Sequence, residues 1–256
     1  MWVCLRGAGG SALLPVSTIY TALPRREIQE VRGTRYELRI SNNAALRAGV
    51  VMSTGKHIVL DVGHANGTGA CVYFRDGKPV SAGSESPSVY AEATSLRNCE
   101  KLEEHAVCAE LAVLLKRLLV LRGFTVSVID YPEASNAMDL NRTVAACNAL
   151  QPDFIVSLHC DCSANKAAQG AHVCYLSRKG LTMARCIAAR LCELLPGRAE
   201  SVVPRANLAI LRKTHAPAVL VECGFLSNEA DAAMLRDNLP GVASAIAQGV
   251  CDYFTA

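Results

Sequence analysis

The chain has 256 residues, of which 51% are hydrophobic, enough to form one full core or one core with an appendage. Lys and Arg number 26 against 23 Asp and Glu, and a net charge of +3 is too small to indicate nucleic-acid binding. The longest apolar candidate for a membrane span, LAVLLKRLLVLRG (111–123), is interrupted by Lys116 and Arg117. We therefore expect an amphipathic helix there and no membrane span.

The first 51 residues differ from the rest because they show no sustained hydrophobic period. Their Gly-rich start fits a secretory signal poorly, and residues 24–41 are compatible with a pair of strands or with no regular structure. Met52 directly precedes the first regular pattern, STGKHIVLDVGH. We expect residues 1–51 to be an N-terminal extension, either disordered or not translated, and residues 52–256 to be the functional domain.

From residue 57 onward, strand-like apolar runs alternate with helical patterns. The strand-like runs are HIVLDV (57–62), FTVSVI (124–129), DFIVSLH (153–159), GAHVCYL (170–176), LAIL (208–211) and AVLVE (218–222). The helical patterns cover about 103–122, 139–150 and 179–195, and two helices follow at the C-terminal end. This alternation predicts a single α/β domain, with a mostly parallel twisted sheet and helices on both faces.

A stretch rich in Gly, Ser and Pro separates the first strand-like run from the first helical pattern. It covers residues 67–98 and is long for a connection between a strand and a helix. We expect a loop over the edge of the sheet that shapes a substrate groove.

The twelve cysteines are scattered through segments with strand or helix patterns. We expect most to be small buried residues without disulfides, which suits a reducing compartment. The HCDC run (159–162) lacks the second cysteine pair of a structural zinc site and the C-x-x-C spacing of a redox pair.

Three of the strand-like runs end on side chains that can bind a metal or move a proton: His64, His159 and Glu222. The carboxyl ends of parallel strands share one edge of a sheet, so these side chains are expected to lie together. Catalytic zinc sites use three protein ligands and keep a fourth place open, and His64 and His159 would supply two of them.

The same places carry a family resemblance. The segments IVLDVGHANGTGA (58–70), DFIVSLHCD (153–161) and LRKTHAPAVLVECGFLSNEAD (211–231) resemble the signature blocks of zinc-dependent N-acetylmuramoyl-L-alanine amidases. The likeness runs from about residue 57 to the C-terminus and leaves out residues 1–51. The compact chain and the run YLSRKGLTMARCIAARL (175–191) also resemble phage endolysin amidases.

The resemblance implies that the third ligand is a Glu at the start of the helix after the first strand. The candidates are Glu92, Glu100, Glu103 and Glu104. We choose Glu104 because the helix that it begins has the expected length and ends at Gly123, and Glu103 is the second choice. His105 is the neighbour that could take over the ligand role. We expect the remaining histidines to be structural or exposed: His57, His172 and His215.

The resemblance assigns Glu222 the role of general base. At the end of the apolar run AVLVE, its carboxylate should be partly desolvated, which raises its pKa toward neutrality. Asn228 is expected to cap the following helix. The chain departs from the family at Ala65 and Asn66, where a GHGG turn is usual, and at Cys223, which leaves substrate preference open.

Taken with the resemblance, these residues predict hydrolysis of the amide between N-acetylmuramic acid and the L-alanine of peptidoglycan stem peptides at the cell envelope. One Zn²⁺ held by His64, Glu104 and His159 would activate water, and Glu222 would move the proton. The alternatives are a zinc-dependent peptidase or deacylase of other specificity, and a non-catalytic wall-binding module. The resemblance also raises the possibility of an inhibitory helix inserted after the second His block, but only SANKAAQ separates HCDC from the next strand-like run, so we expect no such helix here.

Overall fold

The computed structural model describes residues 53–66, 68–84, 99–133 and 137–255 and four short N-terminal strands; side chains are described for 53–66, 68–78, 99–133 and 140–255. The four strands are β1 (Trp2–Gly7), β2 (Gly10–Pro15), β3 (Gln29–Val31) and β4 (Glu37–Arg39). They form a sheet of order β2-β1-β4-β3 that shares no strand with the other two sheets. The predicted domain boundary at Met52 lies outside the described residues.

The main sheet has six strands in the order β12-β11-β13-β10-β5-β9. They are β5 (His57–Val62), β9 (Thr125–Ile129), β10 (Phe154–Asp161), β11 (His172–Tyr175), β12 (Val202–Pro204) and β13 (Ala218–Phe225). β13, β10, β5 and β9 are parallel, whereas β11 runs antiparallel to β13 and pairs in parallel with β12. The predicted fold class, an α/β domain with a mostly parallel sheet, is confirmed.

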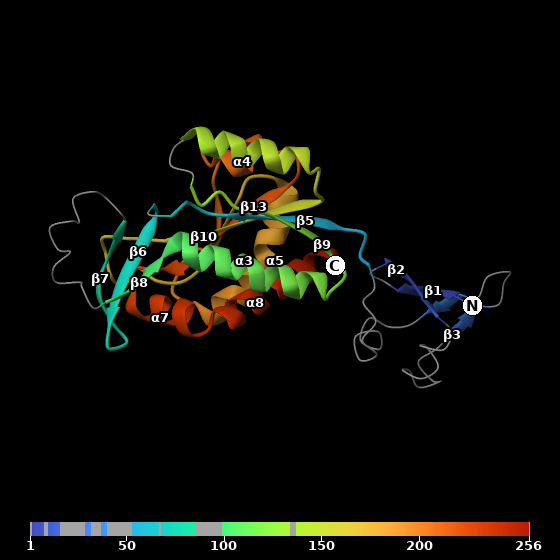
Figure 1. Ribbon diagram of the computed structural model, residues 1–256, viewed down its shortest axis with the longest axis horizontal. Helices are drawn as coiled ribbons and strands as arrows, with labels where there is room; N and C mark the ends of the chain where they lie inside the picture. The colour runs from blue at the N-terminus through green and yellow to red at the C-terminus, as the bar shows by residue number, and fades with distance from the viewer. Residues whose placement is uncertain are drawn as a thin grey trace.

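Helices cover both faces of this sheet. Those described are α3 (Glu104–Val120), α4 (Ala137–Ala149), α5 (Arg178–Leu194), α6 (Ala209–Lys213), α7 (Glu229–Asp237) and α8 (Leu239–Thr255). Figure 1 shows α4 on the opposite side of the sheet from α3 and α8. The larger core lies under α3, α5 and α8, and the smaller under α4 and α6. Strands buried on both faces need near-continuous apolar sequences, which is why the strand-like runs were readable.

The segment LAIL was wrongly predicted to be a strand, because residues 209–213 form the short helix α6. Its Ile210 and Leu211 are buried in the smaller core. Four apolar residues carry too little periodicity to separate a buried helical turn from a strand. The strand of this region, β12, lies a few residues earlier, at Val202–Pro204.

The stretch 67–98 was predicted to be a loop, yet it contains most of a three-stranded antiparallel sheet. β6 (Ala70–Arg75) and β7 (Lys78–Ser84) form a hairpin, and β8 (Glu100–Glu103) pairs with β6 and leads directly into α3. The hairpin turns at Asp76 and Gly77, both at positive φ (51° and 76°). An Asp-Gly pair between strand-like residues is a strong hairpin signal, and it was overlooked. Residues 85–98 lie outside the described residues.

In the part of the chain with described helices, none is long and apolar enough to cross a bilayer. Eleven cysteines are described and none of them is disulfide-bonded; six are buried and five are half-buried. The prediction that most cysteines are buried thus holds for a narrow majority of the described ones, whereas the redox compartment stays a prediction.

Candidate metal centre

The candidate site lies on the sheet face that α4 and α6 cover. Alternate residues of a strand share a face, and residues paired across strands share it too. Ser157 on β10 is paired in register with Asp61 on β5. Two residues further toward the carboxyl end of β10, His159 is paired with Glu222 on β13, which is paired in turn with His172 on β11. Three neighbouring strands therefore present a polar row where the smaller apolar core ends.

Glu104 is the most constrained residue of the site. Its side chain is only 3% exposed, and each carboxylate oxygen accepts a backbone N–H. Ala70 N donates to Oε2 at 2.8 Å and Cys160 N donates to Oε1 at 2.9 Å. These donors come from the first residue of β6 and the end of β10, so the three-stranded sheet and the main sheet together hold this carboxylate.

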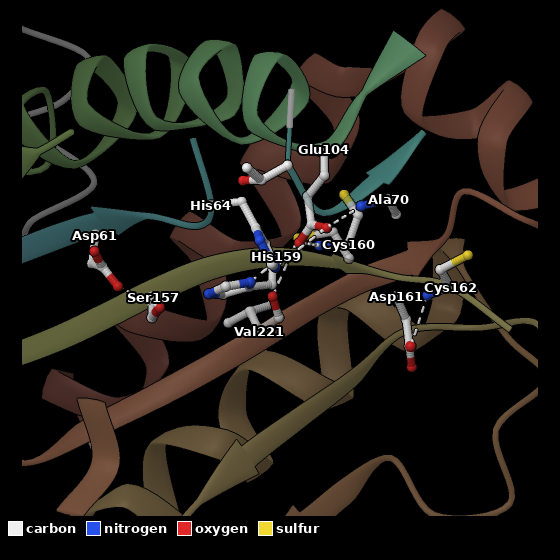
Figure 2. A network of polar contacts seen from close by, with 12 residues as sticks. Asp61, His64, Ala70, Glu104, Ser157, His159, Cys160, Asp161, Cys162 and Val221 are labelled. Atoms are coloured by element: carbon white, nitrogen blue, oxygen red, sulfur yellow. Dashed lines mark hydrogen bonds and ion pairs between the residues drawn. The ribbon is translucent and has the colours of Figure 1, made fainter. Parts of the chain in front are cut away.

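His64 and His159 point at Glu104 from two strand ends, as Figure 2 shows. His64 Nε2 lies 3.6 Å from Glu104 Oε2, and His159 Nδ1 lies 3.1 Å from Glu104 Oε1. One ligand atom from each residue lies within 4.8 Å of the others. Two imidazoles and one carboxylate are the donor set of a catalytic zinc site with an open position, so these residues fit such an ion.

The site is open to solvent on one side. The His64 side chain is 41% exposed and the His159 side chain 19%, against 3% for Glu104. An ion held by these side chains would thus be buried on the Glu104 side and accessible from the His64 side.

Burial and neighbouring charges shift the pKa values of the three candidate ligands. Burial lowers the pKa of His64, against the attraction of Glu104. Burial would also lower the pKa of His159, but its hydrogen bond to Glu104 and the nearby Glu222 raise it to about 9. Burial alone would raise the pKa of Glu104, yet the hydrogen bond and charge of His159, the charge of His64 and the backbone bond from Ala70 lower it overall. The carboxylate is therefore ionised and ready to bind a cation.

Two glycines make room for the ligands. A Cβ at Gly69, whose φ is +84°, would lie 2.6 Å from Glu104 Oε2 and 2.8 Å from His64 Cγ. A Cβ at Gly63 would lie 2.6 Å from His159 Nδ1 and 2.4 Å from Leu158 O. Side chains at either position would displace a ligand.

The loop after β5 places His64 in a left-handed conformation, with φ of 59°. This region is uncommon for residues other than glycine and is often found at functional sites. Thr68 Oγ1 accepts from Ala65 N at 3.0 Å, and Asn66 N donates to Pro132 O at 3.0 Å. The residues that depart from the family turn thus build an ordered turn through their backbone groups.

Glu222 lies on β13, next to His159 in register. Burial raises its pKa to about 7, with further increases from Asp161 and Glu104 and a decrease from His159. Its Oε2 is buried and makes no hydrogen bond in the structure. A half-neutral carboxyl group beside the candidate metal ligands has the proton affinity that a general base needs at neutral pH.

Behind the candidate metal ligands, toward the middle of the sheet, a second polar pair is buried. Ser157 Oγ donates to Asp61 Oδ2 at 2.6 Å, and burial raises the pKa of Asp61 to about 6 (Figure 2). Neither residue was predicted to belong to the site; the only signal in the sequence is that each interrupts an otherwise apolar run.

The alternative ligand candidates lie elsewhere. Glu103 forms an ion pair with Lys101 at 2.5 Å, and His105 Nε2 contacts Asp130 Oδ1 at 2.9 Å. Neither belongs to the cluster of possible metal ligands, whereas the first choice, Glu104, does. Glu92 lies outside the described residues.

The remaining histidines have different surroundings. His57 Nε2 contacts Ser127 Oγ at 2.9 Å at the amino end of the sheet, and His215 is exposed. His172 is 3% exposed and lies opposite Glu222. Its position within the apolar strand run GAHVCYL is the sequence feature that indicates a buried place in the sheet.

The predicted cap of α7 is confirmed, because Asn228 Oδ1 accepts from Ala230 N and Asp231 N. Asp231, one turn further, is buried and accepts from Gly170 N at 2.7 Å and Phe225 N at 2.9 Å. This carboxylate ties the end of β13 to the loop before β11, close to Glu222.

Known proteins resemble this chain over most of its length. A family model described as N-acetylmuramoyl-L-alanine amidase matches residues 58–252. A protein of Staphylococcus epidermidis named "Probable cell wall amidase LytH" is 29% identical over 206 residues, and its Staphylococcus aureus counterpart is 27% identical. The alignments cover 79% of this chain but 60% of those relatives, so the chain spans well under two thirds of their length.

Solved structures show the same fold. The catalytic domain of the CD27L endolysin, which targets Clostridia difficile, aligns with a TM-score of 0.59 at 23% identity, covering 77% of this chain and 97% of that domain. The N-acetylmuramyl-L-alanine amidase Ami1 from Mycobacterium smegmatis aligns with a TM-score of 0.59 at 21% identity, covering 78% and 97%. Because the family model matches residues 58–252, well over half of the chain, this chain belongs to the N-acetylmuramoyl-L-alanine amidase family.

Proposed function

We propose that this protein hydrolyses the amide bond between N-acetylmuramic acid and the first L-alanine of peptidoglycan stem peptides, with one Zn²⁺ bound by His64, Glu104 and His159. The observation that carries the proposal is the convergence of these three side chains beside Glu222. Family membership supports the substrate class. We further propose that residues 52–256 form the catalytic domain and that the enzyme acts at the cell envelope, as the names of its relatives suggest.

Each residue has a distinct task in this mechanism. Zinc, when bound, supplies a Lewis acid that polarises the amide carbonyl and lowers the pKa of water. Glu104, fixed by two backbone N–H groups, orients the site and supplies its negative charge. Glu222 accepts the proton of the attacking water and passes it to the leaving amine of L-alanine.

The test is digestion of purified peptidoglycan sacculi followed by mass spectrometry of the soluble products. We expect release of free stem peptides with an unmodified L-alanine amino group, loss of that release with a chelator, and recovery with added zinc. Glu222→Gln should keep about one zinc per chain by elemental analysis and lose at least ~100-fold in turnover. His64→Ala should lose both the activity and the zinc.

Other products would overturn the assignment. Cuts within the stem peptide would indicate a peptidase, and release of acetate a deacylase. Binding to sacculi without any soluble product would indicate a wall-binding module. Activity that survives complete removal of the metal would exclude the zinc site as its source.

A further inference from the structure

Two buried polar atoms of neighbouring strands are left without a partner. Across the described side chains, His172 Nδ1 and Glu222 Oε2 are the buried nitrogen and oxygen atoms that make no hydrogen bond. Buried polar atoms in folded proteins nearly always have a partner. The two atoms belong to residues that lie directly opposite each other on β11 and β13. Both unpaired atoms therefore lie at the same place in the fold.

The two side chains are within reach of each other. Directly opposed residues of an antiparallel pair share a face of the sheet and have Cβ atoms about 4.5–5.5 Å apart. Rotation about side-chain bonds can therefore join an imidazole N–H to a carboxylate oxygen without backbone movement. Glu222 is opposed by His159 on its other side, so its carboxylate lies between the metal ligands and His172.

The chemistry of His172 suits a donor of one hydrogen bond. The residue is 3% exposed, and burial together with the charges of Arg198 and Arg205 lowers its pKa to about 4. The ring is thus neutral at neutral pH and carries one N–H, which can lie on Nδ1. A neutral donor can orient a carboxylate without adding a charge beside the candidate metal centre.

We propose that His172 is a positioning residue for the general base, donating a hydrogen bond from Nδ1–H to Oε2 of Glu222 and holding the other carboxylate oxygen toward the metal centre. This inference rests on the proposed function of Glu222. It gives the site the arrangement common to activated bases, in which a third group orients the base through the atom that does not react.

The kinetic test compares two substitutions of similar size. His172→Leu removes the donor, whereas His172→Asn keeps an N–H near the position of Nδ1. We expect His172→Leu to lower kcat by about 10–100-fold with KM within about twofold, since supporting hydrogen bonds have effects of this size. His172→Asn should restore most of kcat, and both variants should keep their zinc.

His57→Leu is the matched control, because it removes a histidine hydrogen bond at the amino end of the same sheet. It should leave kcat unchanged. Equal losses in His172→Leu and His172→Asn, or wild-type kcat in His172→Leu, would overturn the proposal.

A second measurement needs no substrate and so separates this inference from the proposed function. In ¹⁵N-histidine NMR spectra, the Nδ1–H resonance of His172, identified by its absence in His172→Leu, should appear downfield and protected from exchange. It should shift on Glu222→Leu and stay in place on His57→Leu. A resonance indifferent to Glu222→Leu would exclude the contact, whatever reaction the enzyme catalyses.

Discussion

Gly69 shows how a single residue without a side chain can decide whether the candidate metal ligands meet. It lies beside both Glu104 and His64, and a Cβ there would overlap the carboxylate at 2.6 Å. We expect Gly69→Ala to weaken zinc binding by at least ~10-fold, measured by competition with a chromophoric chelator, because at least one ligand must move.

Gly55→Ala controls for backbone strain in that experiment. Gly55 also has a positive φ, +67°, but a Cβ there would meet no atom within 4 Å. This variant should lose some stability and keep its zinc affinity. Equal loss of affinity in both variants would show that strain, and not the overlap with Glu104, is responsible.

The raised pKa of Glu222 should set how activity depends on pH. A general base works without its proton, and burial raises the pKa of this carboxyl group to about 7. We therefore expect kcat/KM to rise between pH 5.5 and 8 (roughly the range in which such a group titrates), with a midpoint at or below 7 because bound zinc favours the carboxylate. A profile that falls over this range would contradict the assignment.

At the scale of elements, α7 is joined to the end of β13 by Asp231. Its buried carboxylate accepts from Gly170 N and Phe225 N, and removing it would leave both donors unsatisfied. We expect Asp231→Ala to lower the free energy of unfolding by about 3 kcal/mol in denaturant titrations. Asn228→Ala, which removes the cap of the same helix and the hydrogen bond from Asn228 Nδ2 to Lys166 O, should cost less, about 1–2 kcal/mol.

The elements also differ in how well the sequence predicted them. The long apolar runs of β5, β10 and β13 and the helix α3 were predicted within a few residues, because strands buried on both faces and amphipathic helices have distinctive patterns. The helix α6 was not, because four apolar residues carry too little periodicity to separate a helical turn from a strand. The hairpin β6–β7 was missed although its Asp-Gly turn is a strong hairpin signal.

For the whole molecule, metal binding should be linked to proton release. The hydrogen bond to Glu104 and the charge of Glu222 raise the pKa of His159 from 6.5 to about 9, so the metal-free protein carries that proton at neutral pH. A metal ligand must be deprotonated. We expect about one proton to be released per zinc bound at pH 7.5, measured by calorimetry in buffers of different ionisation enthalpy.

The same shift affects the stability of the metal-free protein. The folded pKa of His159 lies above its ordinary value, so this group stabilises the fold fully below pH 6.5, and the contribution is lost as pH rises through about 9. The chelated protein should show this loss in thermal melts, and His159→Gln should not. Zinc uptake without proton release would show that His159 is neutral before binding.

The sequence by itself determined the fold class, because strands buried on both faces have near-continuous apolar runs, and its signature blocks indicated the family. It also proposed His64, His159 and Glu222 as candidate site residues, because they follow or end such runs. It offered four carboxylates for the third ligand position and favoured Glu104 by the length and end of its helix alone, whereas the backbone donors that hold this carboxylate appear only in the structure. Only the tertiary structure placed His172 opposite Glu222 and Gly69 against two ligands. These relations arise from strand register and from close approach between segments that are distant in sequence. Neither produces a hydrophobic periodicity that could be recognised along the chain.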